Sequence, residues 1–285
     1  MFKVVEQEPA ILLETADHGR VMVVAELHIG VEKRFLHSTV ASGAVAKSLL
    51  RRILSLVKKN RVSYLLVVGD VKDEIFKPVG EEADLIVDFF SKLKKAVGRV
   101  LVVPGNHDGD LAYVLPDGVD MAPSRGVVFE LRGYGERIGV LHGHTWPDAE
   151  LLGAKYLLMA HLHPSYSFRD RFNRRIVMPI WVEINVRSRR GMAQSYLEYF
   201  VGKRFKNPVR KFKEVYGFPI RTRKIIIMPP FNKLLTGLAL NESERVFSTS
   251  PILRSLDPSS IEVNAYLTDL TYLGKLDLNA PQQLY

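Results

Sequence analysis

Apolar runs alternate with amphipathic stretches over the first hundred residues. The runs predict buried strands at Arg20–Ala25, Val62–Val68 and Val100–Val103. Between them, apolar side chains recur at helical spacing from Ser42 onward and again over Glu81–Val97. Since strand, helix, strand, helix and strand follow one another, we expect a parallel sheet with right-handed crossovers. A hairpin at the N-terminus, formed by two short apolar runs, precedes this sheet: Phe2–Val5 and Ala10–Glu14.

The pattern changes after Asp108, where short strands joined by turns predict a second, more antiparallel sheet packed on the first. These strands are Gly126–Leu131, Arg137–Leu141, Lys155–Ala160, Tyr166–Arg169 and Ile176–Val182. A brief helix is expected near Asp148–Leu152, a longer one over Met192–Val201, and part of another over Lys203–Lys213. Later strands are expected at Lys224–Met228 and Ile261–Leu270.

Composition narrows the class of protein. The 285 residues are 47% hydrophobic and 25% charged, as in ordinary globular proteins. No apolar run has the length of a membrane span and the N-terminus does not resemble a signal peptide, so we expect a soluble cytoplasmic protein. The chain contains no cysteine, which excludes disulfides and thiolate metal ligands.

Positive charge is concentrated in one segment. The chain has a net charge of +9, while Arg187–Lys224 alone holds twelve Lys or Arg and two Glu. Such a patch neutralises phosphates, and Tyr196, Tyr199 or Phe200 within it would offer rings for base stacking. A solvated surface insertion explains the same charges equally well. The candidate nucleic-acid contacts are Arg187, Arg189, Arg190, Lys203, Arg204 and Lys206.

Polar side chains of similar chemistry follow the ends of five predicted strands. Val100–Val103 leads into Pro104-Gly105-Asn106-His107-Asp108, and six of the eight histidines lie at such strand ends. Open α/β sheets place their chemistry at these ends. The full set is Glu26 and His28, Asp70, Asn106 with His107 and Asp108, His142 with His144, and His161 with His163.

This set of side chains favours metal binding. Imidazole, carboxylate and amide oxygen without thiolate suit Mn, Fe, Zn, Ni or Co. About seven candidate ligands exceed what one tetrahedral ion takes and suit two ions that share a bridging carboxylate. Two ions about 3.5–4 Å apart activate a bridging water and hold the oxygens of an in-line phosphoryl displacement.

These residues resemble the calcineurin-like metallophosphoesterases, whose ordered signature is Asp-x-His, Gly-Asp, Gly-Asn-His-Asp/Glu, a later His and Gly-His-x-His. The corresponding blocks span roughly residues 20 to 165: Glu26-Leu27-His28, Gly69-Asp70, Gly105-Asn106-His107-Asp108, His142 and Ala160-His161-Leu162-His163. The stretches His-Gly-His-Thr-Trp-Pro, His-Leu-His-Pro and Pro-Pro-Phe-Asn-Lys-Leu-Leu-Thr-Gly are similar to an archaeal branch related to ligase-associated DNA-repair phosphoesterases.

The resemblance implies an α/β fold, a four-layer α/β/β/α sandwich of two packed mixed sheets flanked by helices. It implies a single metallophosphoesterase domain over 1–285, in which 186–224 is a basic insertion and 225–285 supplies closing strands. The implied cofactors are two divalent metal ions, manganese first and Zn, Fe, Ni or Co as alternatives. The implied substrate is a phosphoester, with nucleic acid as a further partner through the basic segment and no membrane partner.

Matching positions imply a role for each residue. One ion would be held by Glu26, His28, Asp70 and His163, and the other by Asp70, Asn106, His142 and His161, so that Asp70 bridges them. His107 would protonate the leaving oxygen or hold the phosphate, while Asp108 orients its ring. His144 would support the site from outside the ligand set.

Two positions depart from the signature. Glu26 replaces an aspartate, which displaces the carboxylate unless the backbone compensates, and Ala160 replaces a glycine. We expect a phosphoesterase that hydrolyses phosphodiester bonds by a two-metal-activated hydroxide, with a DNA or RNA nuclease as the narrower form. The alternatives are a non-catalytic nucleic-acid-binding or scaffold protein with a degenerate metal site at Glu26, and a small-molecule nucleotide phosphatase.

Overall fold

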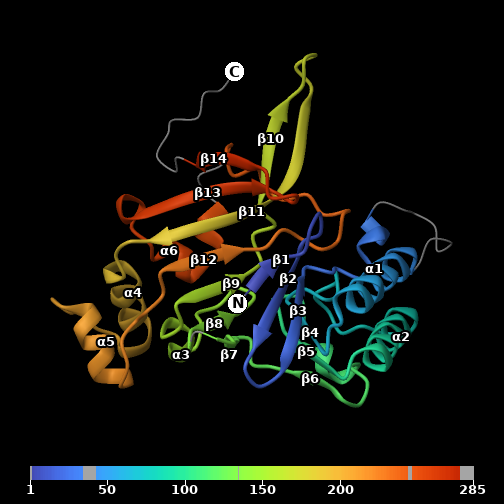
Figure 1. Cartoon of the computed structure of the whole chain (residues 1–285), viewed down its shortest axis with the longest axis horizontal. Coiled ribbons are helices and arrows are strands. Elements are labelled where there is room, and N and C mark those ends of the chain that lie inside the picture. The colour runs from blue at the N-terminus through green and yellow to red at the C-terminus, as the bar shows by residue number, and fades with distance from the viewer. Residues whose placement is uncertain (1, 35–42, 134, 243–245, 277–285) are drawn as a thin grey trace.

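The first of two β-sheets carries the strands that the early apolar runs predict. The computed structural model describes residues 2–34, 43–133, 135–242 and 246–276 (Figure 1). The strand order is β1-β2-β3-β4-β5-β6. Strands β3 to β6 are parallel, and the hairpin of β1 and β2 joins β3 antiparallel. The strands span Phe2–Val4 (β1), Ala10–Thr15 (β2), Gly19–Ala25 (β3), Tyr64–Val68 (β4), Arg99–Val103 (β5) and Val119–Met121 (β6).

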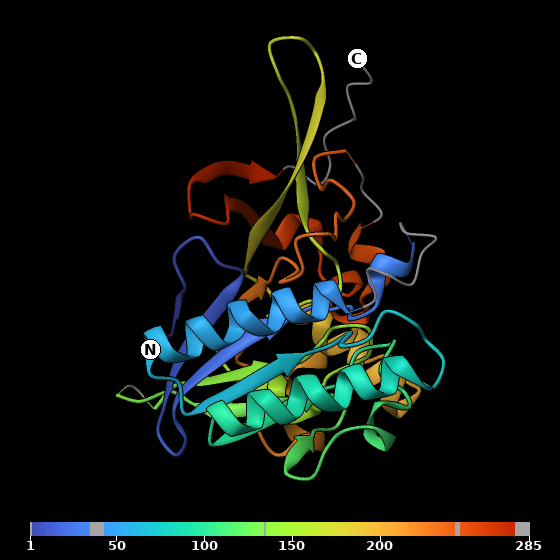
Figure 2. The ribbon, with the colours of Figure 1, turned by 90° about the vertical axis from the view of Figure 1, so that its right-hand side faces the viewer.

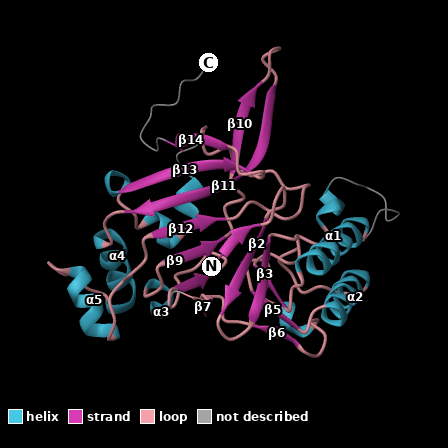
Figure 3. Cartoon of the chain, viewed as in Figure 1, coloured by secondary structure: helices cyan, strands magenta, loops and turns pink. Residues whose placement is uncertain are grey.

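The second sheet is mixed and has the order β14-β13-β11-β12-β9-β8-β7, with β10 paired to β11 off this path (Figure 3). Strands β8, β9 and β12 run parallel, while β7, β11, β13 and β14 pair antiparallel with their neighbours. The strands span Val127–Glu130 (β7), Arg137–Val140 (β8), Tyr156–Met159 (β9), Ser165–Arg169 (β10), Arg175–Val186 (β11), Lys224–Ile227 (β12), Ile261–Leu267 (β13) and Tyr272–Leu276 (β14).

Helices cover the outer faces of both sheets. Helices α1 and α2 lie side by side on the first sheet (Figure 2), and α4 and α5 lie at the opposite side of the molecule (Figure 1). The α-helices span Ala44–Asn60 (α1), Glu81–Ala96 (α2), Ala149–Leu152 (α3), Arg190–Val201 (α4), Pro208–Tyr216 (α5) and Pro251–Arg254 (α6). Short 3₁₀ turns span Val31–Arg34, Leu111–Tyr113, Val246–Thr249 and Pro258–Ser260.

Three apolar layers hold these four structural layers together. In β4, Leu65 and Val67 point to the core under α1 and α2, whereas Leu66 and Val68 point to the core between the sheets. This alternation follows from the two-residue period of a strand. A third core lies between the second sheet and its helices and contains Tyr196. Because every side chain of β4 is buried, and each fully buried Leu or Val contributes roughly 1.5–3 kcal/mol, both faces stabilise the fold.

The predicted fold class, an α/β/β/α sandwich of two packed mixed sheets, is confirmed. Ser42, where the first helix was expected to begin, lies outside the described residues, as do 243–245 and 277–285 of the expected closing segment. Three expectations were wrong in detail. The strand expected over Ile261–Leu270 ends at Leu267 and a turn leads to β14. The strand expected at Ile176–Val182 extends to Val186. The helix expected over Lys203–Lys213 begins only at Pro208, whose fixed backbone favours the first turn.

The two sheets bring the ends of their parallel strands to one place. Glu26 follows β3, Asp70 follows β4 and Asn106 follows β5, while His142 follows β8 and His161 follows β9. In the described part of the chain, no helix is both long and apolar enough to cross a membrane.

Candidate metal centre

Six of the predicted ligands form two groups of the same composition. Each group combines two imidazoles with one carboxylate, and its donor atoms lie within 4.8 Å of one another. Carboxylate and imidazole in this ratio are ligands that Mn, Fe, Zn, Ni and Co share, so the donor set fits divalent metal ions. The groups are Glu26 with His28 and His163, and Asp70 with His142 and His161.

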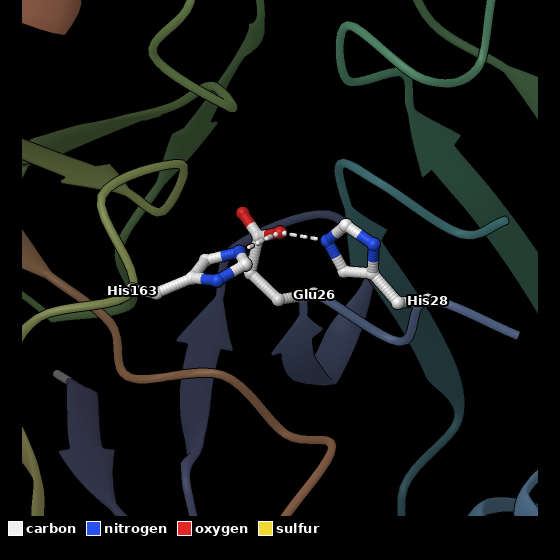
Figure 4. Close-up of side chains that lie close together, drawn as sticks. All are labelled: Glu26, His28 and His163. Atoms are coloured by element: carbon white, nitrogen blue, oxygen red, sulfur yellow. Dashed lines mark hydrogen bonds and ion pairs between the residues drawn. The ribbon is translucent and has the colours of Figure 1, made fainter. Parts of the chain in front are cut away.

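Glu26 lies between two rings in the first group (Figure 4). Its Oε2 is 2.7 Å from His163 Nε2 and 3.1 Å from His28 Nε2. The loop after β3 supplies Glu26 and His28, and the loop after β9 supplies His163. The carboxylate is completely buried, so its position is fixed by these contacts rather than by solvent.

Asp70 joins the two groups. Its Oδ2 lies 3.6 Å from His28 Nε2 and 3.7 Å from His142 Nε2, so one oxygen reaches one ring of each group almost equally. Its Oδ1 accepts a hydrogen bond from the His107 backbone N–H at 3.0 Å, which orients the carboxylate. The Asp70 carboxylate is therefore within reach of both donor groups.

The backbone is strained at most of the candidate ligands. Positive φ angles, which disfavour residues other than glycine, occur at five of them. Such conformations cost about 1–3 kcal/mol each and persist where the surrounding structure fixes them, often at functional sites. No sequence pattern signals this feature. The five residues are Glu26 (58°), His28 (40°), Asp70 (43°), His161 (69°) and His163 (44°).

Two glycines make room for the ligands. A Cβ atom at Gly69 would lie 1.9 Å from His142 Cδ2, and one at Gly105 would lie 2.1 Å from Asp70 Oδ1. Both contacts are far shorter than van der Waals separation, so only glycine leaves space for the ring and the carboxylate. The glycines of the Gly-Asp and Gly-Asn-His-Asp blocks are therefore explained by packing at the site.

Hydrogen bonds behind the donor groups orient the rings. Asp73 Oδ1 accepts from His28 Nδ1 at 3.0 Å, and Arg34 holds the other oxygen of Asp73 at 2.6 Å. His144 Nδ1 lies 2.9 Å from His142 Nδ1. Partners of this kind fix the nitrogen that a histidine offers to a metal. Sequence reasoning missed Asp73, whose one signal is its position three residues after Asp70.

The charges of the cluster shift several pKa values. Burial lowers the pKa of His28, but the hydrogen bonds to Asp73 and Glu26 outweigh burial and raise it to about 9. Burial raises the pKa of the Glu26 carboxyl, yet His163 and His142 outweigh it and hold that pKa well below its usual range. Burial and the nearby His142 lower the pKa of both His144 and His161 to about 4. In the metal-free site the Glu26 carboxylate therefore faces a protonated His28 ring, whereas the His144 and His161 rings are neutral near pH 7.

His107 lies at the open side of the site, where 17% of its side chain is exposed. Its Nδ1 donates to the Asp73 carbonyl at 2.6 Å, and its Nε2 lies 3.8 Å from Asp70 Oδ2. The expectation that Asp108 orients this ring was wrong. Asp108 is buried and accepts from the backbone N–H groups of Gly105 at 2.9 Å and Val71 at 3.0 Å, so it ties together the loops after β4 and β5.

The remaining predicted residues lie around this centre or away from it. The Asn106 side chain is exposed beside the site. The candidate nucleic-acid contacts from Arg187 to Lys206 begin where β11 ends, and Asn185 there pairs with Lys224, the first residue of β12. The start of this segment therefore lies at the opposite end of the strands from His161, and the role of these residues stays a prediction. Tyr196 cannot stack on a base, because its ring is buried in the core.

The late Pro-Pro-Phe-Asn stretch supports the loop that carries Glu26. Phe231 donates its backbone N–H to the Ala25 carbonyl at 2.8 Å, and Asn232 donates to the Glu26 carbonyl at 3.3 Å. The buried Asn232 amide also donates to the Leu27 carbonyl at 2.7 Å. A segment two hundred residues away in sequence thus fixes the backbone of the first donor group.

Fold and site together define an α/β protein with a candidate metal centre at the strand ends of two packed sheets. The model of the calcineurin-like phosphoesterase family matches residues 19–187. The chain belongs to this family. It is a metallophosphoesterase, a hydrolase that acts on ester bonds.

Three of the solved structures that resemble this chain are as follows. Nuclease MPE of Pseudomonas putida has 16% sequence identity and a TM-score of 0.46, over 96% of this chain and 100% of that chain. The phosphoesterase YfcE of E. coli has 16% identity and a TM-score of 0.33, over 53% and 73% of the two chains. A Vps29 variant of Entamoeba histolytica has 18% identity and a TM-score of 0.27, over 55% and 71%. A search of curated protein sequences gave no significant match.

Proposed function

We propose that the chain hydrolyses phosphodiester bonds of nucleic acid at a centre of two divalent ions. The observation that carries this proposal is the position of Asp70, whose Oδ2 lies 3.6 Å from His28 and 3.7 Å from His142. Asp70 supplies the carboxylate of the second group and also faces a ring of the first, which suits two neighbouring ions better than one. A single tetrahedral ion would leave donors of one group without a partner.

One ion would be held by Glu26, His28 and His163, the other by His142 and His161, with Asp70 between them. Asn106, which is exposed beside the site, would complete the second set. Manganese is the first choice for these donors, with Zn, Fe, Ni or Co as alternatives. When bound, such ions supply a water nucleophile of lowered pKa and neutralise charge on the phosphate.

His107 would transfer the proton to the leaving oxygen. Its Nδ1–H donates to the Asp73 carbonyl, so the doubly protonated form of this partly exposed ring would release its proton from Nε2. General acids of this kind contribute roughly 10²–10⁴-fold to a rate. Asp73 is a positioning residue, because it holds the rings of both His28 and His107.

The β10–β11 hairpin suits a nucleic-acid strand as substrate. It begins two residues after His163 and projects from the body of the molecule (Figures 1 and 2). Near its tip, Arg171 and Arg174 lie over the ring of Phe172 at 4.8 and 5.3 Å, and 64% of Phe172 is exposed. Arginines neutralise phosphates and aromatic rings stack on bases, so the hairpin would guide a single strand toward the site.

The test combines three substrates with one pair of variants. Protein loaded with Mn²⁺ is expected to hydrolyse bis-p-nitrophenyl phosphate and single-stranded DNA faster than p-nitrophenyl phosphate. R171A/F172A is expected to lower DNA hydrolysis about tenfold, which corresponds to loss of one stacked base, and to leave bis-p-nitrophenyl phosphate turnover unchanged. The matched control Y199A/R204A removes one exposed ring and one arginine on the far side of the fold.

Three outcomes would overturn the proposal or part of it. Absence of turnover with every divalent metal would favour the non-catalytic scaffold. Turnover of the monoester alone would favour a small-molecule phosphatase. A loss of DNA hydrolysis in Y199A/R204A but not in R171A/F172A would move the nucleic-acid contact to the basic segment of Arg187–Lys224.

A further inference from the structure

A polar cavity lies at the opposite end of strands β8 and β9 from the candidate metal centre. The metal-centre residues follow the last residues of β8 and β9, whereas this cavity lies beside the first residues of the same strands. Its volume is about 350 Å³, within the range of small-ligand sites. We call it the basic pocket, and its charged lining residues are Glu136, Arg137, Lys155, Arg189, Arg221 and Arg223.

The charges of the basic pocket are incompletely neutralised. Glu136 pairs with Lys155, and Glu150 pairs with Arg137 at 3.1 Å. Among the described residues, no carboxylate forms an ion pair with the other three guanidinium groups of the lining. These three belong to Arg189, Arg221 and Arg223.

Backbone hydrogen bonds fix the main chain at Arg221 and Arg223. Arg221 donates its backbone N–H to the Leu152 carbonyl at 2.8 Å, and Arg223 donates to the Lys155 carbonyl at 2.9 Å. Between them, the buried Thr222 hydroxyl donates to the Leu152 carbonyl at 3.2 Å. Because alternate side chains of an extended segment share a side, both arginines point away from Thr222 toward the pocket.

Arg189 reaches the same place from the end of β11. Its Nε donates to the Thr222 carbonyl at 3.1 Å, which leaves its terminal nitrogens for another acceptor. Burial and the nearby Arg223 lower the pKa of Arg189. The positive charges of these arginines repel one another in the ligand-free pocket. An anion that enters would offset this repulsion.

We propose that the basic pocket binds an oligophosphate anion, either free pyrophosphate or the phosphate chain of a nucleoside di- or triphosphate. Guanidinium groups form paired hydrogen bonds with phosphate oxygens, so three of them match an anion of several negative charges. This site is separate from the metal centre and does not depend on the proposed substrate.

The test is calorimetric titration of the full chain with pyrophosphate in EDTA at low salt, because chelation removes phosphate binding through metal ions. R221Q/R223Q is expected to weaken binding at least tenfold. The matched control R210Q/K213Q removes two exposed cations on α5, outside the pocket lining, and is expected to bind like the unmodified protein. Circular dichroism checks that each variant is folded, and R221Q alone gives a second, milder variant.

Two further titrations identify the source of the phosphate chain. Tighter binding of ATP than of pyrophosphate would support a nucleotide ligand, and equal binding would support the free anion. The proposal is overturned if pyrophosphate and ATP do not saturate the unmodified protein at millimolar concentration, or if R221Q/R223Q binds as tightly as the control. It is also overturned if only a single-stranded oligonucleotide binds, since the arginines would then belong to an extended nucleic-acid surface.

Discussion

Glu26 Oε1 lies 2.8 Å from His142 Nε2, although the two residues belong to different donor groups. The same oxygen accepts the His161 backbone N–H at 2.7 Å, while Oε2 faces His28 and His163. The longer side chain at this position therefore reaches both halves of the candidate centre. The packing therefore accommodates glutamate at this position, where the family signature has aspartate.

Shortening Glu26 to aspartate is expected to weaken metal binding. The Glu26 backbone is held by Gly69 and Asn232, with both hydrogen bonds at 3.3 Å, so it cannot move to return the carboxylate to its place. Glu26→Asp should lower the affinity for Mn²⁺ about tenfold, or roughly 1.4 kcal/mol, as measured by titration of the metal-free protein.

Glu130→Asp, on an exposed position of β7, is the matched control for this change and should bind metal normally. A gain in both metal affinity and activity in Glu26→Asp would show instead that Glu26 is a degenerate ligand.

Replacement of His107 by alanine separates proton transfer from metal binding. Because its Nδ1 donates to the Asp73 carbonyl, the ring is expected to act through Nε2 alone. His107→Ala should lower kcat on a dinucleotide by about 10²–10⁴. It should lower kcat less on bis-p-nitrophenyl phosphate, whose leaving group departs without a proton, and metal content should not change. Equal losses on both substrates would exclude the role of general acid.

Asp108 is expected to matter for stability. Its buried carboxylate accepts backbone N–H groups from Gly105, Val71 and Lys72, and burial raises its pKa. Asp108→Ala should lower the free energy of unfolding by roughly 3 kcal/mol, because buried donors are left unpaired. Asp108→Asn keeps an acceptor oxygen and should lose less. Urea unfolding measures both, and an unchanged midpoint in Asp108→Ala would contradict this role; exposed Asp117→Ala is the control.

The stability of the metal-free protein should fall as pH rises from about 6.5 to about 9. The pKa of His28 is about 9 in the fold and 6.5 is its ordinary value, so the protonated ring stabilises the fold fully below the lower value. This contribution, roughly 3 kcal/mol at most, is lost as pH rises through the higher value. The groups that face His28 are Glu26, Asp70, Asp73, His107 and His163.

Urea unfolding in EDTA across this pH range tests the expectation. Asp73→Asn removes the largest contribution that raises the pKa and should flatten the pH dependence, whereas exposed Asp17→Asn should not. A profile that is flat in the unmodified protein would contradict the assigned network.

The fold could be predicted from the sequence where local pattern and packing agree. The strands that end at Ala25, Val68 and Val103 are buried on both faces, so their apolar runs identified both the strands and their ends. The prediction of one strand over Ile261–Leu270 was wrong because the alternation of apolar and polar residues continues through a turn. Only the pairing of β13 with β14 reveals that turn.

The types of ligand residue at the site could be predicted from the sequence, but their contacts and orientations could not. Imidazoles and carboxylates after strand ends indicated which residues meet. The partners behind them depend on contacts between loops that sequence spacing does not encode: Asp73 behind His28, the Asp73 carbonyl behind His107, and Asn232 behind Glu26. The sequence also did not indicate that α4 buries Tyr196 on its inner face, because the segment was defined by its charge.

The most direct test of the central claim is anomalous diffraction from crystals of the protein loaded with Mn²⁺. Two peaks are predicted on either side of Asp70, one beside Glu26, His28 and His163 and the other beside His142 and His161. A single peak, or peaks away from these residues, would contradict a two-ion centre bridged by Asp70.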